Sequence, residues 1–147
     1  MVELAADIAA AYDDVRDDKT ATNWICVQYK DDKSDSLILA GQGTGGLEEF
    51  TAQLKEDQAA FGYLRIVVGN DPLSQRAKFL LVSWCGPKVK VMRKAKLSVH
   101  IADVKTVFKS FAVEISASGL EDLREKDVQL LLKKAMGANY DRQSSAY

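Results

Sequence analysis

The stretch QRAKFLLVSW, residues 75–84, ends in the run FLLVSW, in which residues on both faces of a strand would be apolar. A strand with two apolar faces is typical of the middle of a sheet that is covered on both sides. Residues 22–30, TNWICVQYK, have the same character, with Trp24 and Cys26 on one face and Ile25 on the other. The sequence therefore predicts a sheet that lies between two layers of helix.

The segments on either side of this strand alternate between strand and helix patterns. We predict strands over 22–30, 36–40, 60–68, 75–84 and 111–116, and helices over 2–17, 47–56, 88–109 and 120–135. Turn-forming residues at 31–36 and 69–74 indicate two hairpins. The third helix is either continuous or kinked near 98–100. This order predicts an α/β (α+β) fold, a central mixed sheet flanked by helices on both faces.

Apolar residues at helical spacing predict the buried faces of the first and last helices. The first stripe consists of Leu4, Ile8, Tyr12 and Val15. The last consists of Leu120, Leu123, Val128, Leu131 and Ala135. Residues three and four apart lie on one face of a helix, so each stripe should pack against the sheet.

The composition predicts one soluble globular domain. The chain has 147 residues, of which 47% are hydrophobic and 28% charged, with 2 Pro and 2 Cys. Two cysteines are too few for a disulfide scaffold, which favours a reducing compartment. No apolar run reaches the roughly 20 residues that span a bilayer, and the N-terminus lacks a signal-peptide pattern. We expect a domain over 2–137 and a polar, mobile tail over 138–147.

Charge is distributed unevenly along the chain. The formal net charge is −1, yet residues 1–60 carry −8 and residues 61–147 carry +7. Between Arg76 and Lys109, nine basic residues stand against the single acid Asp103. Such a segment can attract an acidic partner, or it can be a solvated helix face.

The residues of catalytic and metal chemistry form no recognisable constellation. His100 is the only histidine, lies within the basic helix and has no evident partner. Cys26 and Cys85 are far apart in sequence and cannot complete a usual zinc site with one histidine. No serine lies in a nucleophile elbow. We therefore expect a protein that is not an enzyme and that holds no metal or cofactor.

The glycine-rich segment GQGTGG, residues 41–46, matches the letters of a dinucleotide-binding motif. That motif also requires a parallel strand–helix–strand unit, whereas the preceding strand here resembles the second arm of a hairpin. No lysine follows the glycines as in a P-loop. The favoured interpretation is a flexible connection, and nucleotide binding is the alternative.

Four stretches together resemble the actin-depolymerising-factor homology (ADF-H) family: AAYDDVRDD (10–18), SQRAKFLLVSW (74–84), RKAK (93–96) and KKAMGANYD (133–141). The resemblance covers nearly the whole chain in one register. It implies a mixed sheet of five or six strands and a protein that binds actin filaments and modulates their dynamics without strong severing. The alternative within the family is cofilin-like monomer binding and filament disassembly.

The resemblance also implies which residues contact actin. They are Lys78 with Arg76 on a strand, Val91, Arg93, Lys94, Ala95 and Lys96 on the basic helix, and Lys133 with Lys134 near the C-terminus. Met92 stands where cofilin-type relatives have a lysine, and no serine precedes Ser34. Both departures argue against severing and against regulation by an N-terminal phosphoserine.

The same resemblance and the charge pattern lead to expectations about partners and location. We expect F-actin as the partner, with an anionic phosphoinositide lipid as a further ligand of the same basic patch and no nucleic acid. The protein is expected to be a monomer in the cytoplasm and cytoskeleton.

The spacing of these residues predicts one continuous surface. Arg76 and Lys78 are two apart on a strand and share a face. Lys90, Arg93 and Lys94 are neighbours on a helix, beside the apolar pair of Val91 and Ala95. We expect Lys78 to lie next to this helical ridge. The other interpretation of Lys78 is a charge at a sheet edge that discourages aggregation.

Overall fold

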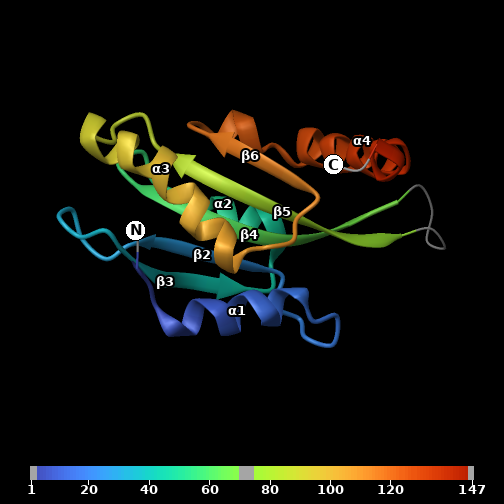
Figure 1. Ribbon diagram of the computed structural model, residues 1–147, viewed down its shortest axis with the longest axis horizontal. Coiled ribbons are helices and arrows are strands. Elements are labelled where there is room, and N and C mark those ends of the chain that lie inside the picture. Colours follow the sequence, from blue (N-terminus) through green and yellow to red (C-terminus); the bar gives the residue numbers. More distant parts are fainter. Residues whose placement is uncertain (1–2, 70–74, 146–147) are drawn as a thin grey trace.

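A computed structural model describes the backbone of residues 3–69 and 75–145 and the side chains up to residue 135 (Figure 1). The strands are β1 (Glu3–Leu4), β2 (Trp24–Tyr29), β3 (Ser36–Gly43), β4 (Ala59–Val68), β5 (Arg76–Cys85) and β6 (Val113–Ala117). The helices are α1 (Ala6–Arg16), α2 (Gly46–Thr51), α3 (Val91–Val107), the 3₁₀ helix η1 (Leu120–Leu123) and α4 (Glu125–Ser145). In the described residues, no helix is both long enough and apolar enough to cross a membrane.

The strands form one mixed sheet in the order β1-β3-β2-β4-β5-β6. The long hairpin of β4 and β5 lies near its centre, with pairs running from Ala59–Cys85 to Val68–Arg76. β6 joins β5 in parallel, and β1 joins β3 in parallel. The mixed sheet that the sequence predicts is confirmed.

A hydrophobic core lies on each face of the sheet. Odd-numbered residues of β4 and β5, such as Phe61, Tyr63 and Leu81, pack with residues of α1 and α3. Even-numbered residues, such as Leu64 and Leu80, pack with residues of α2 and α4. Burial of a whole Leu or Phe side chain stabilises the folded state by about 1.5–3 kcal/mol. Because the central strands bury such side chains on both faces, they hold a layer of helices on each side of the sheet.

The first helix is shorter than predicted because residues Glu3–Leu4 form the short strand β1. Glu3 and Leu4 pair with Ser36 and Leu37, and the Ala5 N–H donates to Leu37 O at 3.0 Å. Backbone groups at the open edge of β3 are thus satisfied by residues that sequence periodicity assigns to a helix. The prediction of helix over residues 3–5 is wrong for this reason.

The strand expected over 36–40 extends through the glycine segment to Gly43. β3 pairs with β2 from Leu37–Tyr29 to Gly43–Trp24, with an irregularity between Cys26 and Val27. The helix that follows is only Gly46–Thr51. Half of the expected glycine-rich connection is therefore part of the sheet.

The basic helix is continuous and starts later than expected. α3 runs from Val91 to Val107, so the alternative with a kink near 98–100 is wrong. Gly86 and Pro87 lie in the preceding turn, where the Lys88 N–H donates to Glu56 O at 2.8 Å. Pro87 is therefore not part of the first turn of this helix.

The last helical segment is divided in two. A short 3₁₀ turn precedes α4, so the residues that face the core are Leu123, Val128 and Leu132, whereas Leu120 and Leu131 are exposed. Leu132, four residues after Val128 on the continuous helix α4, takes the core position instead of Leu131, so the prediction of Leu131 is wrong. The backbone of α4 continues to Ser145, but side chains after Ala135 lie outside the described residues. The proposed tail over 138–147 stays a prediction.

Candidate protein interaction surfaces

One group of expected contact residues gathers where the β4–β5 hairpin meets α4. Arg76 and Lys78 are even-numbered residues of β5, like Leu80, and successive even-numbered side chains of a strand lie on the same face. Both therefore lie on the side of the sheet that α4 covers. Arg76 is exposed and Lys78 is half-buried. Figure 1 shows α4 alongside this end of the hairpin, and the Gln129 Nε2 donates to Val67 O at 3.4 Å.

Two further expected contact residues, both lysines, lie on α4, the helix that packs on this face of the sheet. Lys133 follows Gln129 by four residues, which places both on one side of the helix. Lys133 and its neighbour Lys134 are exposed. We call Arg76, Lys78, Lys133 and Lys134 the hairpin–α4 surface. Its two pairs of positive charges, on β5 and on α4, are more than fifty positions apart in the sequence.

The exposed face of α3 carries an apolar stripe in its N-terminal half. Val91 is 81% exposed, Met92 74% and Val99 68%, and Ala95 is exposed as well. The opposite face of the helix carries Leu97, His100 and Val104, which are buried. We call the four exposed residues Val91, Met92, Ala95 and Val99 the α3 stripe. The sequence had indicated Val91 and Ala95, but Val99 was not among the predicted contacts.

The N-terminus of α3 has an unfavourable charge distribution. Its N-cap residue, Lys90, makes no side-chain hydrogen bond to the helix, and no acidic residue lies in the first turn. Lys90, Arg93 and Lys94 instead place positive charge at the positive end of the helix dipole. An acidic group from outside would be favoured at this end of the helix.

Arg93 does not lie on the exposed face with its expected neighbours. Its Nη2 donates to the carbonyl oxygens of Asp31, Asp32 and Ser34 at 2.9–3.1 Å. Its guanidinium carbon lies 3.9 Å from the centre of the Tyr29 ring. The expectation that Arg93 belongs to an open ridge is therefore wrong in geometry, because the turn between β2 and β3 already binds its guanidinium.

Lys96 is also bound by this turn. Its Nζ donates to Asp35 Oδ1 at 3.1 Å, and this bond lowers the pKa of the Asp35 carboxyl. Both side chains are nearly half exposed, so the pair is accessible to solvent. Lys94 is exposed, and no ion pair to it is found in the described part of the chain. Of the expected basic residues in 91–96, Lys94 is therefore the one that the structure presents outward.

Lys78 and the start of α3 lie at opposite ends of β5. From Lys78 to Cys85 the strand rises about 23 Å at about 3.3 Å per residue, and only residues 86–90 separate Cys85 from α3. The two also face opposite sides of the sheet, since α3 packs with Leu81 and not with Leu80. The single continuous ridge that we predicted is wrong, and two separate surfaces replace it.

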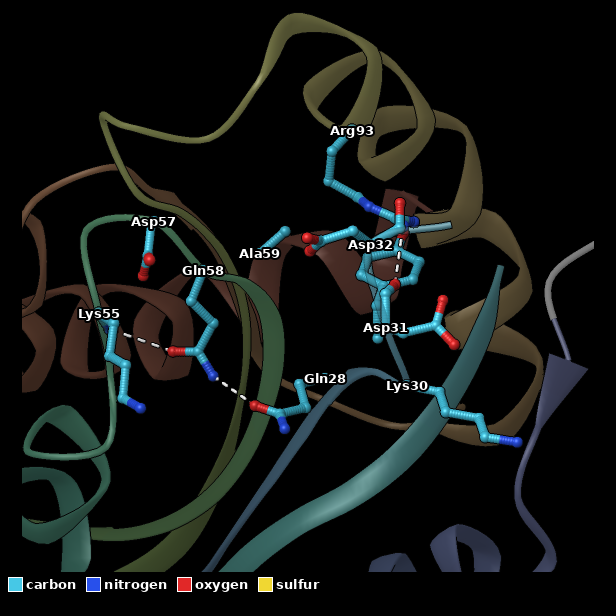
Figure 2. Close-up of a pocket in the computed structure, with 10 residues that line it drawn as sticks. Gln28, Lys30, Asp31, Asp32, Lys55, Asp57, Gln58, Ala59 and Arg93 are labelled. Carbon is cyan, nitrogen blue, oxygen red and sulfur yellow. Dashed lines mark hydrogen bonds between the residues drawn. The ribbon is translucent and has the colours of Figure 1, made fainter. Parts of the chain in front are cut away.

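A polar pocket lies beside the start of α3 (Figure 2). Its volume is about 290 Å³, and its charged lining residues are Lys30, Asp31, Asp32, Lys55, Asp57 and Arg93. Figure 2 shows Gln58 bridging Lys55 and Gln28: the Gln58 Nε2 donates to Gln28 Oε1 at 2.7 Å. Charges of both signs line the pocket, and the guanidinium of Arg93 is already engaged, so the lining defines no ligand class.

The glycine segment is occupied by a carboxylate of the protein itself. Glu49 Oε1 accepts hydrogen bonds from Trp24 Nε1 at 2.8 Å and from the Gly45 N–H at 3.2 Å. A Cβ on Gly43 would overlap this carboxylate and the Trp24 ring, which explains the glycine there. A bound phosphate would meet the negative charge of Glu49, and β3 is antiparallel to β2. Both findings argue against nucleotide binding at residues 41–46.

The two cysteines and the histidine are structural. Burial raises the pKa of Cys26 to about 12 and also raises that of Cys85. Both thiols are therefore protonated near neutral pH and are weak nucleophiles. His100 is buried on α3, where its Nδ1 lies 2.7 Å from Tyr29 Oη. Among the residues described, no group of three His, Cys, Asp or Glu could hold a metal ion.

Comparisons with known proteins place the chain in a family. The family model described as cofilin/tropomyosin-type actin-binding protein matches residues 1–133. The chain therefore belongs to this family, as its resemblance to ADF-H proteins implied, and it is an actin-binding protein of the cytoskeleton.

Within the family the similarity is to coactosins. Coactosin of Dictyostelium discoideum is 36% identical over 142 residues, which cover 96% of this chain and 95% of that protein. The crystal structure of coactosin from Entamoeba histolytica superposes with a TM-score of 0.84 at 30% identity and covers 92% of this chain and 97% of that one. The solution structure of mouse coactosin, described as an actin filament binding protein, superposes with a TM-score of 0.74 at 35% identity. The match covers 97% of this chain and 98% of that one.

Proposed function

We propose that this protein binds actin filaments by contacting two neighbouring subunits at once and that it modulates filament dynamics without strong severing. The observation that carries the proposal is the separation of its two surfaces. The hairpin–α4 surface and the α3 stripe lie at opposite ends of β5 and on opposite sides of the sheet. A single acidic patch cannot meet both, whereas a polymer offers repeated copies of its surface.

The hairpin–α4 surface supplies charge. Four cations attract an acidic partner and orient it during encounter, and this effect weakens as salt increases. Exposed ion pairs contribute only about 0.2–1 kcal/mol each. Lys78 is half-buried already, so we expect it to become fully buried on binding and to contribute more than the exposed Arg76.

The α3 stripe supplies apolar contact. When a partner covers exposed Val and Met side chains, binding is favoured by about 25 cal/mol for each Å² of apolar surface removed from water. The adjacent helix start lacks acidic residues, so carboxylates of the partner would relieve its excess positive charge. Lys94 lies at the edge of the stripe and faces the same partner.

Similarity to coactosins supports filament binding over monomer binding. The mouse structure is described as that of an actin filament binding protein. Met92 supplies no positive charge to the start of α3, which favours an apolar contact there over a purely electrostatic one. Cofilin-like monomer binding with disassembly is the competing function, and faster loss of dilute filaments in a pyrene-actin assay would support it.

The remaining parts of the proposal concern ligands and location. We place the protein in the cytoplasm and cytoskeleton, as a monomer that does not catalyse a reaction. The four cations of the hairpin–α4 surface suit an anionic phosphoinositide as a second ligand. Vesicles with and without phosphoinositide, added to the filament assay below, would test competition for this surface.

The proposal is tested by sedimentation with actin filaments. Wild-type protein should pellet with filaments, less so as salt increases, and Lys78→Glu should weaken binding by at least about tenfold. The matched control is Lys19→Glu, an exposed charge reversal in the turn after α1. The proposal fails if folded Lys78→Glu pellets like wild type, or if Lys19→Glu loses binding equally.

A further inference from the structure

Arg93 connects α3 to the turn between β2 and β3. Its Nη2 reaches three carbonyl oxygens of the turn, and Nη1 lies 3.6 Å from Asp35 Oδ1. Only 14% of its side chain is exposed, in contrast to the adjacent Met92 at 74%. The guanidinium therefore has little surface left for a binding partner.

The residues that bind Arg93 make further contacts with the rest of the protein. Its guanidinium stacks on the Tyr29 ring, and Tyr29 Oη is hydrogen-bonded to the buried His100 Nδ1 at 2.7 Å. Asp31 stabilises the turn, because its Oδ1 accepts hydrogen bonds from the backbone N–H groups of Lys33 and Ser34. Arg93 thus joins α3 to the turn and adds its hydrogen bonds to those that Asp31 makes within it.

Arg65 shows the same arrangement elsewhere in the fold. Its Nη1 donates to Val15 O at 2.9 Å and Asp17 O at 2.7 Å, and its Nη2 donates to Thr20 O at 2.7 Å. There too, one guanidinium binds the carbonyl groups of a turn to a neighbouring element. A planar guanidinium can serve several acceptors at once, which a lysine ammonium does with less fixed geometry.

The first turn of α3 depends on the contacts of Arg93, because the residues at the start of the helix do little to stabilise it. Lys90 gives no side-chain cap, and the first turn combines positive charges with the positive end of the helix dipole. Val91 and Met92 are exposed and pack little against the protein. The contacts of Arg93, together with the Lys96–Asp35 pair, hold this turn against the sheet.

We infer that Arg93 is a positioning residue for actin binding and not a contact residue: it fixes the first turn of α3 so that Val91, Met92 and Lys94 are presented in one arrangement. This inference rests on the function proposed above. Without Arg93 the first turn would have to be ordered when the filament binds, which lowers affinity. Because Arg93 itself does not meet actin, its loss should leave the salt sensitivity of binding unchanged.

The test compares Arg93→Lys and Arg93→Met with Lys94→Met as the matched control at the next position. Affinity for actin filaments is measured by sedimentation over a range of salt concentrations, with thermal unfolding to confirm the fold. Amide hydrogen exchange of residues 31–35 and 91–95 is measured on the same variants without actin. Arg93→Lys is the decisive variant, because it keeps the positive charge but loses the planar guanidinium that donates to several carbonyl oxygens at once.

We expect Arg93→Lys and Arg93→Met to weaken binding alike, by about three- to tenfold at every salt concentration. Both should speed exchange in 31–35 and 91–95. Lys94→Met should weaken binding mainly at low salt, because it removes an exposed charge, and should leave exchange unchanged.

The inference is overturned if Arg93→Lys binds like wild type while Arg93→Met loses salt sensitivity as Lys94→Met does, since Arg93 would then be a direct charge contact. It is also overturned if both variants bind like wild type, because the role of Arg93 would then concern stability alone. If Arg93→Met does not fold, the lysine variant decides. Failure of wild-type protein to bind filaments would refute the proposed function instead, and exchange would still report whether Arg93 orders the turn.

Discussion

At the scale of single residues, burial on the inner face of α3 determines which protonation state of His100 the folded protein favours. The buried His100 shares a hydrogen bond with Tyr29 Oη. Burial lowers the pKa of His100 below 6.5, although the nearby carboxylates Asp35 and Asp103 oppose the shift and Arg93 reinforces it. The Tyr29 hydroxyl can donate to a neutral imidazole or accept from an imidazolium, so burial and not this hydrogen bond disfavours the charged form. The folded state therefore favours neutral His100.

This preference gives a pH dependence of stability. Because the folded pKa is below the unfolded value of 6.5, the full stability is present above pH 6.5 and falls as the pH drops through the folded pKa. We expect the free energy of unfolding in urea to decrease in this window for wild type. The decrease should be smaller for His100→Gln, which cannot titrate. Equal pH profiles of the two proteins would contradict this assignment.

Residue identity alone could not reveal the role of Arg93. In the sequence it is one cation among several in RKAK (93–96), and all of them look equally available. What distinguishes it is the turn of β2 and β3, which lies about sixty positions earlier in the chain. A charge run identifies a basic helix, but the partners that engage each charge come from tertiary structure.

At the scale of elements, long apolar patterns predicted the fold well and the ends of elements less well. The strands at 22–30, 60–68 and 75–84 are confirmed with shifts of one or two residues. The errors at helix starts fall where another element replaces the predicted one: β1 pairs with β3 at residues 3–4, and η1 interrupts the helix predicted over 120–135. Helical periodicity carries no information about either event.

The start of α3 is the element boundary where stability and binding compete. Replacing the N-cap Lys90 by serine should supply the missing cap and remove a positive charge from the helix start. We expect Lys90→Ser to raise the free energy of unfolding in urea by about 0.5–1 kcal/mol. The control is Lys88→Ser, which removes an exposed charge that pairs with Glu56 outside the helix.

The cap prediction has a clear negative outcome. If Lys90→Ser leaves the unfolding free energy unchanged, or if Lys88→Ser raises it equally, the start of α3 is not poorly capped. Loss of the Lys90 charge should weaken filament binding at low salt, whereas the better-ordered first turn should not lower the affinity at high salt.

At the scale of the whole molecule, the asymmetry of charge along the chain is real but is not one patch. The sequence located the basic segment between Arg76 and Lys109 and most of the residues now proposed as contacts. It could not show that seven residues of β5 lie between Lys78 and the turn before α3, because spacing along a strand becomes distance only when the topology is known. The fold turns one basic segment into two surfaces that face different directions.

The most direct test of two-subunit binding is an electron cryomicroscopy reconstruction of actin filaments decorated with this protein. We predict that each bound copy places the hairpin–α4 surface against one actin subunit and the α3 stripe against the next. A reconstruction in which one copy touches a single subunit, or in which Val91 and Met92 face solvent, would contradict the account.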